Sequence, residues 1–220
     1  MYEGVIFDVD GTLVDSNDAH ARAWVEAFAE AGHPVPFERV RRLVGMGGDQ
    51  LLPEAAGLSA EAEPGRSIAK RRGEVFEQKF LPQLRPLPGA RELVARLRHD
   101  GYRLGVASSA QPAELEPLLR LAGVEDLLRE RTSAGDVEES KPEPDIVLAA
   151  LRKLRLGPSA ALMIGDTPYD VEAARRAGVA LIAFRSGGWS DPDLRGALAV
   201  YDGPADLLAR IESSPLRRAA

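Results

Sequence analysis

Short apolar segments alternate with helical patterns along most of this 220-residue chain. Each segment is a continuous apolar run, which is typical of a strand in a parallel sheet that is covered on both faces. We expect strands at residues 4–7, 103–107, 161–164, 180–184 and 197–201, and helices at residues 90–98, 113–122, 145–154 and 171–177. Strands that alternate with such helices are typical of βαβ units. The sequence therefore predicts an α/β fold with a Rossmann-like, doubly wound parallel sheet.

One stretch interrupts this alternation. Between Asp15 and Leu87 we find no convincing strand, but helical patterns occur at residues 18–31, 37–43, 49–56 and 60–80. A stretch of about 70 residues is too long for an unstructured loop in a compact domain. Leu-Pro-Gly at residues 87–89 then ends it with turn residues. We therefore expect an all-helical domain at residues 15–87, inserted into a core of residues 1–14 and 88–220.

The composition excludes several classes of protein. Apolar residues are 45% and charged residues 28% of the chain, which is typical of a globular protein and excludes intrinsic disorder. The net charge of −6 argues against nucleic acid as a partner, and no apolar run is long enough to span a membrane. The chain has no cysteine, which excludes disulfides and fits a cytoplasmic protein. An enzyme that acts on a small molecule is the better expectation.

Polar side chains follow several of the predicted strands. Ligands of open α/β sheets bind at the carboxyl ends of the strands, so residues at these positions are candidates for a site. They are Asp8 and Asp10, Ser108 and Ser109, Asp166 with Asp170 one helical turn further on, and Lys141 at the start of a later helix. Four separate segments thus bring carboxylates, a hydroxyl and an ammonium to one edge of the sheet.

Asp8 and Asp10 are two residues apart, so their side chains point the same way if the chain is extended. Two carboxylates this close repel each other unless a cation lies between them. Mg²⁺ suits one or two carboxylates together with phosphate oxygens and waters, and Asp166 can complete the set. The alternative for Asp-Val-Asp-Gly at residues 8–11 is a surface turn, against which the other three segments argue.

Three of these residues also have purely structural interpretations. Ser108 can cap the helix that follows it, or it can help to bind a phosphate at that helix N-terminus. Lys141 can be a solvated charge, although the prolines of Ser-Lys-Pro-Glu-Pro-Asp stiffen its loop. Asp170 ends the segment Thr-Pro-Tyr-Asp, which is typical of a capping box with proline at the first helical position. The sequence leaves both interpretations open for each residue.

Taken in order, these segments resemble the motifs of the haloacid dehalogenase (HAD) superfamily. The matching segments are Asp-Val-Asp-Gly-Thr at residues 8–12, Ser108 after an apolar strand, Lys141 in its proline-rich loop, and Gly165-Asp166 followed by Asp170. The resemblance covers essentially the whole chain. The helical insertion is similar to the cap domain of the phosphoglycolate phosphatase and β-phosphoglucomutase branch.

The resemblance implies a role for each matching residue. Asp8 would be the nucleophile that attacks phosphorus and forms an aspartyl-phosphate. Asp10 would be the general acid for the leaving oxygen and then the base for water. Ser108 would hydrogen-bond the phosphoryl group, and Lys141 would neutralise the charge on Asp8 and on the phosphoryl oxygens.

It also implies a Mg²⁺ site and a binding site for the phosphoryl group. Asp166 would hold the metal together with Asp8 and the backbone carbonyl of Asp10. Asp170 would be either a direct ligand or a residue that orients Asp166 or a metal-bound water. The further candidates for substrate binding in the core are Gly11, Thr12 and Ser109.

Within this superfamily a few residues indicate the reaction. The dehalogenases lack a carboxylate at the position of Asp10, so cleavage of a carbon–halogen bond is not expected. The segment around His20 is similar to the mutase segment with a hinge-proximal histidine, but His20 can equally pack beside Trp24, four residues further on. The mutase pattern is incomplete, because Gly47-Gly48-Asp49 stands where the mutases carry an arginine, and their cap lysine is replaced near Arg72.

Residues 42–50 form the expected specificity loop of the cap. Gly47 and Gly48 would permit a close approach of the backbone to a ligand, or they would only separate two cap helices. Arg42 is our candidate for a contact with an anionic group of the substrate, since arginine suits bidentate contacts with carboxylate or phosphate.

The sequence therefore predicts a Mg²⁺-dependent phosphatase that hydrolyses a small phosphomonoester metabolite. A sugar phosphomutase is the alternative among enzymes, and a non-catalytic phospho-ligand-binding regulatory domain is the alternative from another class. A pure binding domain has no need of both Asp8 and Asp10, which favours an enzyme. We expect no nucleic-acid or membrane partner, and the sequence indicates neither the substrate nor the oligomeric state.

Overall fold

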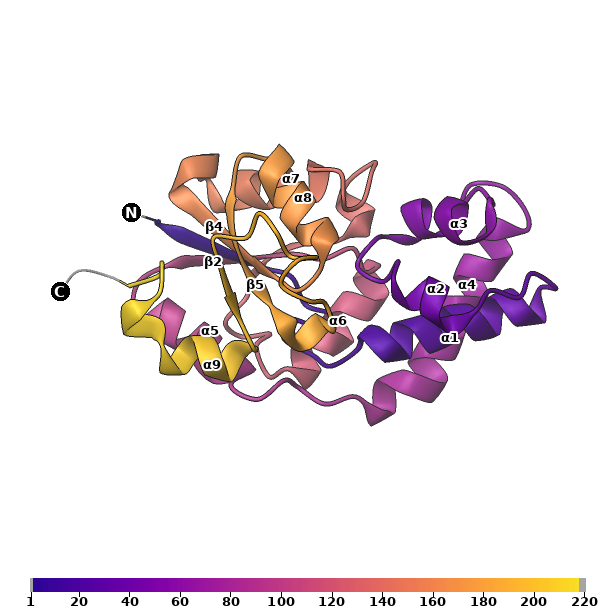
Figure 1. The fold of residues 1–220 in the computed structure, drawn as a ribbon, viewed down its shortest axis with the longest axis horizontal. Coiled ribbons are helices and arrows are strands. Elements are labelled where there is room, and N and C mark those ends of the chain that lie inside the picture. The colour runs from indigo at the N-terminus through magenta and orange to yellow at the C-terminus, as the bar shows by residue number, and fades with distance from the viewer. Residues whose placement is uncertain (1, 218–220) are drawn as a thin grey trace.

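The computed structural model describes residues 2–217 and shows a layered α/β core with a group of helices at one end (Figure 1). The core contains a sheet of six parallel strands in the order β3-β2-β1-β4-β5-β6. The strands are β1 (Gly4–Phe7), β2 (Arg103–Ala107), β3 (Glu130–Thr132), β4 (Ala161–Gly165), β5 (Ala180–Phe184) and β6 (Ala199–Tyr201). The chain runs from β1 through β2 to β3 on one side and then crosses to β4 on the other side of β1, so the topological switch point lies between β1 and β4.

Helices cover both faces of the sheet, as the predicted doubly wound fold requires. On one face are α5 (Ala90–His99), α6 (Pro112–Leu121) and α9 (Pro204–Ala209), and on the other are α7 (Asp145–Leu154) and α8 (Pro168–Arg176). Successive residues of β1 point to opposite faces, so Val5 and Phe7 pack in one apolar cluster and Ile6 in the other. The predicted fold class is confirmed.

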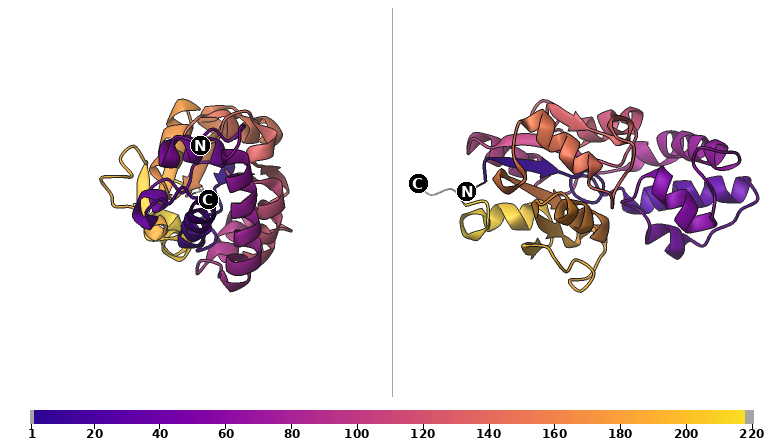
Figure 2. Two further views of the ribbon diagram at one scale, coloured as in Figure 1. Left: turned by 90° about the vertical axis from the view of Figure 1, so that its right-hand side faces the viewer. Right: turned by 90° about the horizontal axis from the view of Figure 1, so that it is seen from above.

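The helices at the end of the core form a cap with an apolar centre of its own. They are α1 (Asn17–Glu30), α2 (Phe37–Arg41), α3 (Gly48–Ala56) and α4 (Gly65–Val75). Trp24 and Phe28 of α1 pack there with Val40, Leu52 and Ile68 of the other three helices. The right-hand view of Figure 2 also shows the cap beyond one end of the sheet.

Two adjacent segments of the chain connect the core and the cap. Val14 forms an antiparallel bridge with Pro86. The amide of Leu87 donates to the carbonyl of Leu13 at 2.9 Å, and the amide of Asp15 donates to the carbonyl of Arg85 at 3.1 Å. The domain boundaries that we expect at residues 15 and 87 fall within this pair of segments and remain a prediction.

Several elements differ from the sequence-based expectation. β3 was not predicted because it is a short edge strand of sequence Glu-Arg-Thr without an apolar run, and the six-residue helix α9 was missed as well. β6 begins at Ala199 rather than at residue 197. The single helix expected at residues 60–80 is wrong, because α4 begins only at Gly65 and a wider helical turn follows at Phe76–Phe80. No helix within residues 2–217 is long and apolar enough to cross a membrane.

Candidate active site

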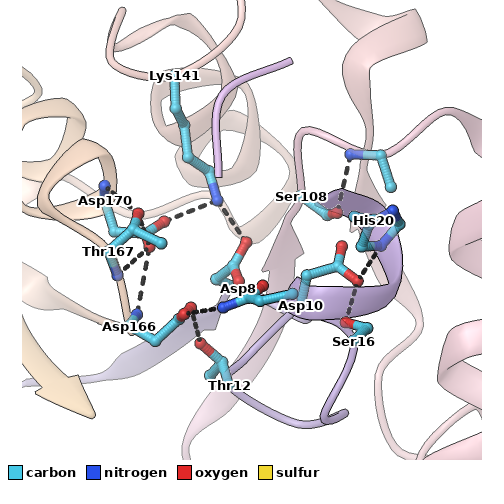
Figure 3. A network of polar contacts seen from close by, with 12 residues as sticks. Asp8, Asp10, Thr12, Ser16, His20, Ser108, Lys141, Asp166, Thr167 and Asp170 are labelled. Atoms are coloured by element: carbon cyan, nitrogen blue, oxygen red, sulfur yellow. Dashed lines mark hydrogen bonds and ion pairs between the residues drawn. The ribbon is translucent and has the colours of Figure 1, made fainter. Parts of the chain in front are cut away.

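The candidate site lies where β1 and β4 end side by side. The amide of Asp8 donates to the carbonyl of Ile164 at 2.9 Å, which extends the pairing of the two strands beyond Phe7. Neighbouring strands are only about 4.8 Å apart, so the first residues after them are close in space. The structure thus brings Asp8 and Asp166 together at the switch point, and Figure 3 shows the polar network around them.

Lys141 lies between two carboxylates of this network. Its Nζ contacts Oδ1 of Asp8 and donates to Oδ1 of Asp170 at 2.8 Å, and the residue is only 1% exposed. Burial alone would lower the pKa of Lys141, but the carboxylates of Asp170 and Asp8 raise it above its usual range. Lys141 therefore keeps its charge, and the alternative of a solvated lysine is wrong.

Asp8, Asp166 and Asp170 form a buried carboxylate cluster, in which one oxygen of each lies within 4.8 Å of the others. Burial raises the pKa of Asp8 well above its usual range against the opposing effect of Lys141, and the carboxylates of Asp170 and Asp166 raise it further. Burial and the charge of Asp170 raise the pKa of Asp166 to about 8. A hard divalent cation fits this set of oxygen donors, since one ammonium does not balance three carboxylates.

Two hydrogen bonds from different parts of the chain hold Asp166. Thr12 Oγ1 donates to Asp166 Oδ1 at 2.9 Å, and Asn17 Nδ2 donates to Asp166 Oδ2 at 2.8 Å. Asn17 is the first residue of α1, so a cap helix contacts a carboxylate of the candidate metal site directly. Its second polar atom, Oδ1, is buried without a hydrogen-bond partner within the described part of the chain. Nothing in the sequence pattern distinguished Asn17 from an ordinary residue at a helix start.

Asp170 combines the two roles that the sequence left open. Its Oδ2 accepts from the backbone amides of Asp166 and Thr167 at 3.2 and 3.0 Å, and its own amide donates to Thr167 Oγ1 at 3.2 Å. These contacts confirm the predicted capping box at the start of α8. Its Oδ1 binds Lys141 instead. Asp170 thus fixes the backbone of Asp166 with one oxygen and Lys141 with the other.

The carboxylate of Asp10 faces the cap rather than the cluster. Its Oδ1 accepts from Ser16 Oγ at 2.5 Å and lies 2.7 Å from His20 Nε2 (Figure 3). Burial acts to raise the pKa of Asp10, but its electrostatic interaction and hydrogen bond with His20 and the hydrogen bond from the Ser16 hydroxyl lower it overall. The expectation that the side chains of Asp8 and Asp10 share one cation is therefore wrong for the carboxylate of Asp10. A contact through its backbone carbonyl remains a prediction.

The loops after β1 and β2 supply the other core residues of the site. Ser108 Oγ accepts the amide of Ala110 at 3.1 Å and so closes a turn, whereas Gln111 is the N-cap of α6. Ser109 Oγ is buried and, among residues 2–217, has no hydrogen-bond partner. Gly11 has φ of +73°, and a Cβ there would lie 2.2 Å from Oδ2 of Asp166. Only glycine allows this close approach of the first loop to Asp166.

A small cavity lies between these core residues and the cap. The cavity volume is about 40 Å³, which leaves room for roughly three water molecules. The core lines it with Asp8, Asp10, Ser109 and Ala110, and the cap lines it with His20, Trp24, Val44, Gly45, Met46, Leu51 and Arg72. A cavity of this volume is smaller than an organic phosphate, so the structure describes the site without room for a whole substrate.

The cap residues predicted to bind substrate only partly line this cavity. His20 does, but Arg42 does not, because its guanidinium lies 4.9 Å from the ring centre of Trp189 and its carbonyl accepts from the Tyr169 hydroxyl. The prediction for Arg42 is corrected accordingly. Gly47 and Gly48 also lie outside the cavity lining, and a Cβ on Gly47 would be 2.2 Å from Ser140 Oγ of the core. Arg72, which the sequence indicated only as the replacement for a mutase lysine, is the cap arginine that lines the cavity instead of Arg42.

Comparison with known proteins agrees with this architecture. A family model for haloacid dehalogenase-like hydrolases matches residues 2–178. The chain is 33% identical to a phosphoglycolate phosphatase of Rhodospirillum rubrum, over 94% of this chain and 90% of that protein. It is 30% identical to an N-acetylmuramic acid 6-phosphate phosphatase of Pseudomonas aeruginosa, over 94% and 93%. The crystal structure of a hydrolase from Pseudomonas syringae has a TM-score of 0.88 and 31% identity to this chain, and the match covers 96% of this chain and 98% of that one.

Fold, site and family match together define the class of protein. The chain belongs to the haloacid dehalogenase-like hydrolase family, which confirms the resemblance drawn from its motifs. Within this family it is a phosphoric monoester hydrolase, as the phosphatase names of its relatives indicate.

Proposed function

We propose that the protein is a Mg²⁺-dependent phosphatase that hydrolyses a small phosphomonoester metabolite through an aspartyl-phosphate on Asp8. The observation that carries this proposal is the position of Asp8. Its carboxylate contacts Lys141 inside the buried cluster, and the same residue lines the cavity under the cap. A nucleophile that attacks a phosphoryl dianion needs compensating positive charge beside it, and this arrangement would supply it.

The residues that would hold Mg²⁺ are Asp8, Asp166 and the backbone carbonyl of Asp10, with Asp170 behind them. The support for this assignment is the excess of buried carboxylates over ammonium groups and the raised pKa of Asp8 and of Asp166. When bound, the ion would neutralise these carboxylates and polarise the oxygens of the phosphoryl group.

In the first step a carboxylate oxygen of Asp8 forms a bond to phosphorus as the bond from phosphorus to the leaving oxygen breaks. The carboxyl group of Asp10 gives its proton to the leaving oxygen, while Lys141 compensates charge on Asp8 and on the phosphoryl oxygens. Asp10 must be protonated at this stage. The negative phosphoryl group favours that form, because a nearby like charge raises the pKa of a carboxyl group.

In the second step the carboxylate of Asp10 takes a proton from water as the water oxygen attacks phosphorus. The bond from phosphorus to Asp8 breaks, inorganic phosphate forms and Asp8 is regenerated. His20 and Ser16 support this step, since they lower the pKa of Asp10 and so favour the form that accepts a proton.

The two alternatives drawn from the sequence have less support. A sugar phosphomutase is not favoured, because the curated relatives cited above carry phosphatase names and the cap keeps only part of the mutase pattern. A non-catalytic binding domain does not account for two carboxylates, Asp8 and Asp10, that line one cavity, with Lys141 in contact with Asp8.

Phosphate release tests the proposal. With an aryl phosphate as substrate, Mg²⁺ should support steady release of inorganic phosphate, excess chelator should stop it, and added Mg²⁺ should restore it. With β-glucose 1-phosphate and a trace of the 1,6-bisphosphate, the product should be free phosphate or nothing. Undiminished turnover in chelator would refute the metal assignment, and efficient formation of glucose 6-phosphate would establish the mutase alternative.

A further inference from the structure

A chain of four polar side chains crosses between the cap and the core. Glu114 of α6 pairs with Arg72 of α4, with the side chains only 11% and 13% exposed. Arg72 Nη2 lies 2.6 Å from His20 Nδ1, and His20 Nε2 lies 2.7 Å from Asp10 Oδ1. Because Arg72 can only donate, Nδ1 of His20 is the acceptor and Nε2 carries the proton directed at Asp10. The proposed function uses Asp10 and does not involve Glu114.

Arg72 carries the one permanent positive charge among the described residues that line the cavity. An arginine at this position would ordinarily be read as an anchor for a second anionic group of the substrate, such as a carboxylate or a phosphate. Here both terminal nitrogens are already engaged, Nη1 by Glu114 and Nη2 by His20. The guanidinium also lies 5.4 Å from the ring centres of both Trp24 and Phe76, which hold it in place.

Within residues 2–217, Arg72 is the one ion-pair partner of Glu114. Its second oxygen, Oε2, is buried and has no hydrogen-bond partner within the described chain. A substrate anion that drew Arg72 away would leave a buried carboxylate without its counter-ion, which is strongly unfavourable. An anion that bound without displacing Glu114 would instead face the negative charge of Glu114, which already neutralises Arg72. Either way, the cavity disfavours a second negative charge on the substrate.

The remaining polar atoms of the cavity suit hydroxyl groups. Ser109 Oγ and Arg72 Nε are both buried and lack a partner among residues 2–217. Ser109 can donate or accept, and Nε can donate, so a neutral hydroxyl can bond to either of them. The rest of the wall is apolar, with Trp24, Val44, Met46, Leu51 and Ala110. Such a surface packs against the carbon skeleton of an alcohol better than against an ion.

We infer that the leaving group of the substrate is an uncharged, hydroxyl-bearing alcohol, and that Glu114 determines this specificity by neutralising Arg72. The inference rests on the proposed phosphatase function and narrows its substrate class. It separates this chain from a relative named as a phosphoglycolate phosphatase, because the glycolate released from phosphoglycolate carries a carboxylate. Glu114 is a positioning residue that acts through Arg72 and has no part in the bond-breaking steps.

Two esters of equal carbon count provide the test. 2-Phosphoglycolate carries a carboxylate at the position where 2-hydroxyethyl phosphate carries a hydroxymethyl group. In Mg²⁺, the wild type should show kcat/KM at least about tenfold higher for the hydroxyethyl ester, since unfavourable like-charge contacts cost that much or more. Glu114→Gln keeps the size of the side chain and frees the charge of Arg72. It should shift the ratio of the two kcat/KM values toward phosphoglycolate by at least about tenfold.

A matched control lies on the same helix. Glu116 also pairs with an arginine, Arg131, but at the surface and away from the cavity. Glu116→Gln should leave the ratio of the two kcat/KM values unchanged within about twofold. The double variant Arg72→Gln/Glu114→Gln should lose the gain for phosphoglycolate, because that gain requires the freed arginine. A merely structural role of Glu114 would lower both rates together and leave their ratio unchanged.

Either of two results would overturn the inference: a wild-type preference for phosphoglycolate, or the same ratio for Glu114→Gln and Glu116→Gln. If the wild type released phosphate from no ester, the phosphatase proposal would fail, but the inference could still be decided. Calorimetric binding of the two esters to the Asp8→Asn variant in Mg²⁺ gives the same comparison without turnover. We expect Asp8→Asn to bind the hydroxyethyl ester more tightly than phosphoglycolate, and the double variant Asp8→Asn/Glu114→Gln to show the reverse. Equal or opposite affinities would contradict the inference.

Discussion

Asp166 illustrates how its surroundings set the chemistry of one residue. It is fully buried behind Thr12 and Asn17, next to the carboxylate of Asp170. The hydrogen bonds favour its charged form, while burial and the neighbouring charge favour the neutral form and prevail, so that its pKa rises to about 8. A cation in the cluster would reverse that balance. The protonation of Asp166 and metal binding should therefore be linked.

This linkage predicts a pH-dependent stability. A carboxyl whose pKa is raised in the folded state contributes stability below its ordinary pKa near 4, and this is lost as the pH rises through about 8. Without metal, the temperature of the unfolding midpoint should therefore decrease as the pH is raised from about 5.5 to about 8. Mg²⁺ needs the deprotonated carboxylate, so it should raise the midpoint more at the higher pH.

The control for this experiment is Asp166→Asn, which lacks the titrating group. Its unfolding midpoint should depend less on pH and respond weakly to Mg²⁺ at either pH. A stabilisation by Mg²⁺ that is equal at both pH values in the wild type would show that Asp166 is not linked to the metal.

The sequence identified the core residues of the site better than those of the cap. Asp8 and Asp166 directly follow strands and Lys141 lies in the loop just before a helix, so the topology predicts that they meet at one edge of the sheet. Arg72 and Glu114 lie on helices from different parts of the chain, and no local pattern indicates that they pair across the cavity. Arg42 was the more obvious arginine, but its side chain lies on Trp189 because the loop that carries it packs against the core.

At the scale of elements, the loop before α3 shows why the cap can approach the core so closely. The backbone of Gly47 lies against Ser140, and Asp49 Oδ2 accepts the amide of Ser140 at 3.0 Å. Ser140 directly precedes Lys141, so this loop supports the residue that contacts Asp8. The glycines were predicted to permit a close approach to a ligand. At Gly47 the close approach is to the core itself.

Gly47→Ala should therefore impair catalysis by keeping the cap from seating. Its new Cβ would lie 2.2 Å from Ser140 Oγ and would displace the segment that holds Lys141. We expect kcat/KM to fall by roughly 10- to 100-fold, as small misplacements of reacting groups do. The neighbouring Gly48→Ala is the control, because its Cβ would meet only Trp24 at 3.4 Å or more, an ordinary contact. Steady-state kinetics of both variants decide the matter, and equal effects would count against this role of the loop.

The elements themselves were predictable where packing reinforces the local pattern. Strands β1, β2, β4 and β5 are almost entirely buried, and their apolar runs predicted them correctly. The edge strand β3 is polar, and its pairing with β2 arises only in the folded molecule. In the cap, the apolar pattern of residues 60–80 did not show where the helix begins, because Gly65 packs tightly against the backbone of Ser59.

For the molecule as a whole, the cap controls what reaches Asp8. The cavity beside Asp8 has room for only a few waters, and contacts such as Arg41 with the carbonyl of Gly187 (2.6 Å) join the cap to the core. The two connecting segments at Val14 and Pro86 lie side by side where the chain passes between the core and the cap. A phosphatase must open enough to admit its substrate, and it must also let one water reach the phosphorylated enzyme. Lid domains commonly control both kinds of access.

The most direct test of the central claim is phosphate release by Asp8→Asn, measured beside the wild type at saturating Mg²⁺ and substrate. The amide keeps the shape of the carboxylate but not its negative charge or its nucleophilicity, so kcat should fall by at least about a thousandfold. The unfolding midpoint should confirm that the variant is folded. Asp126→Asn, which loses only a surface contact with Arg91, should keep the wild-type rate. Turnover by folded Asp8→Asn within about tenfold of the wild type would contradict the account, because no covalent role for Asp8 could then be maintained.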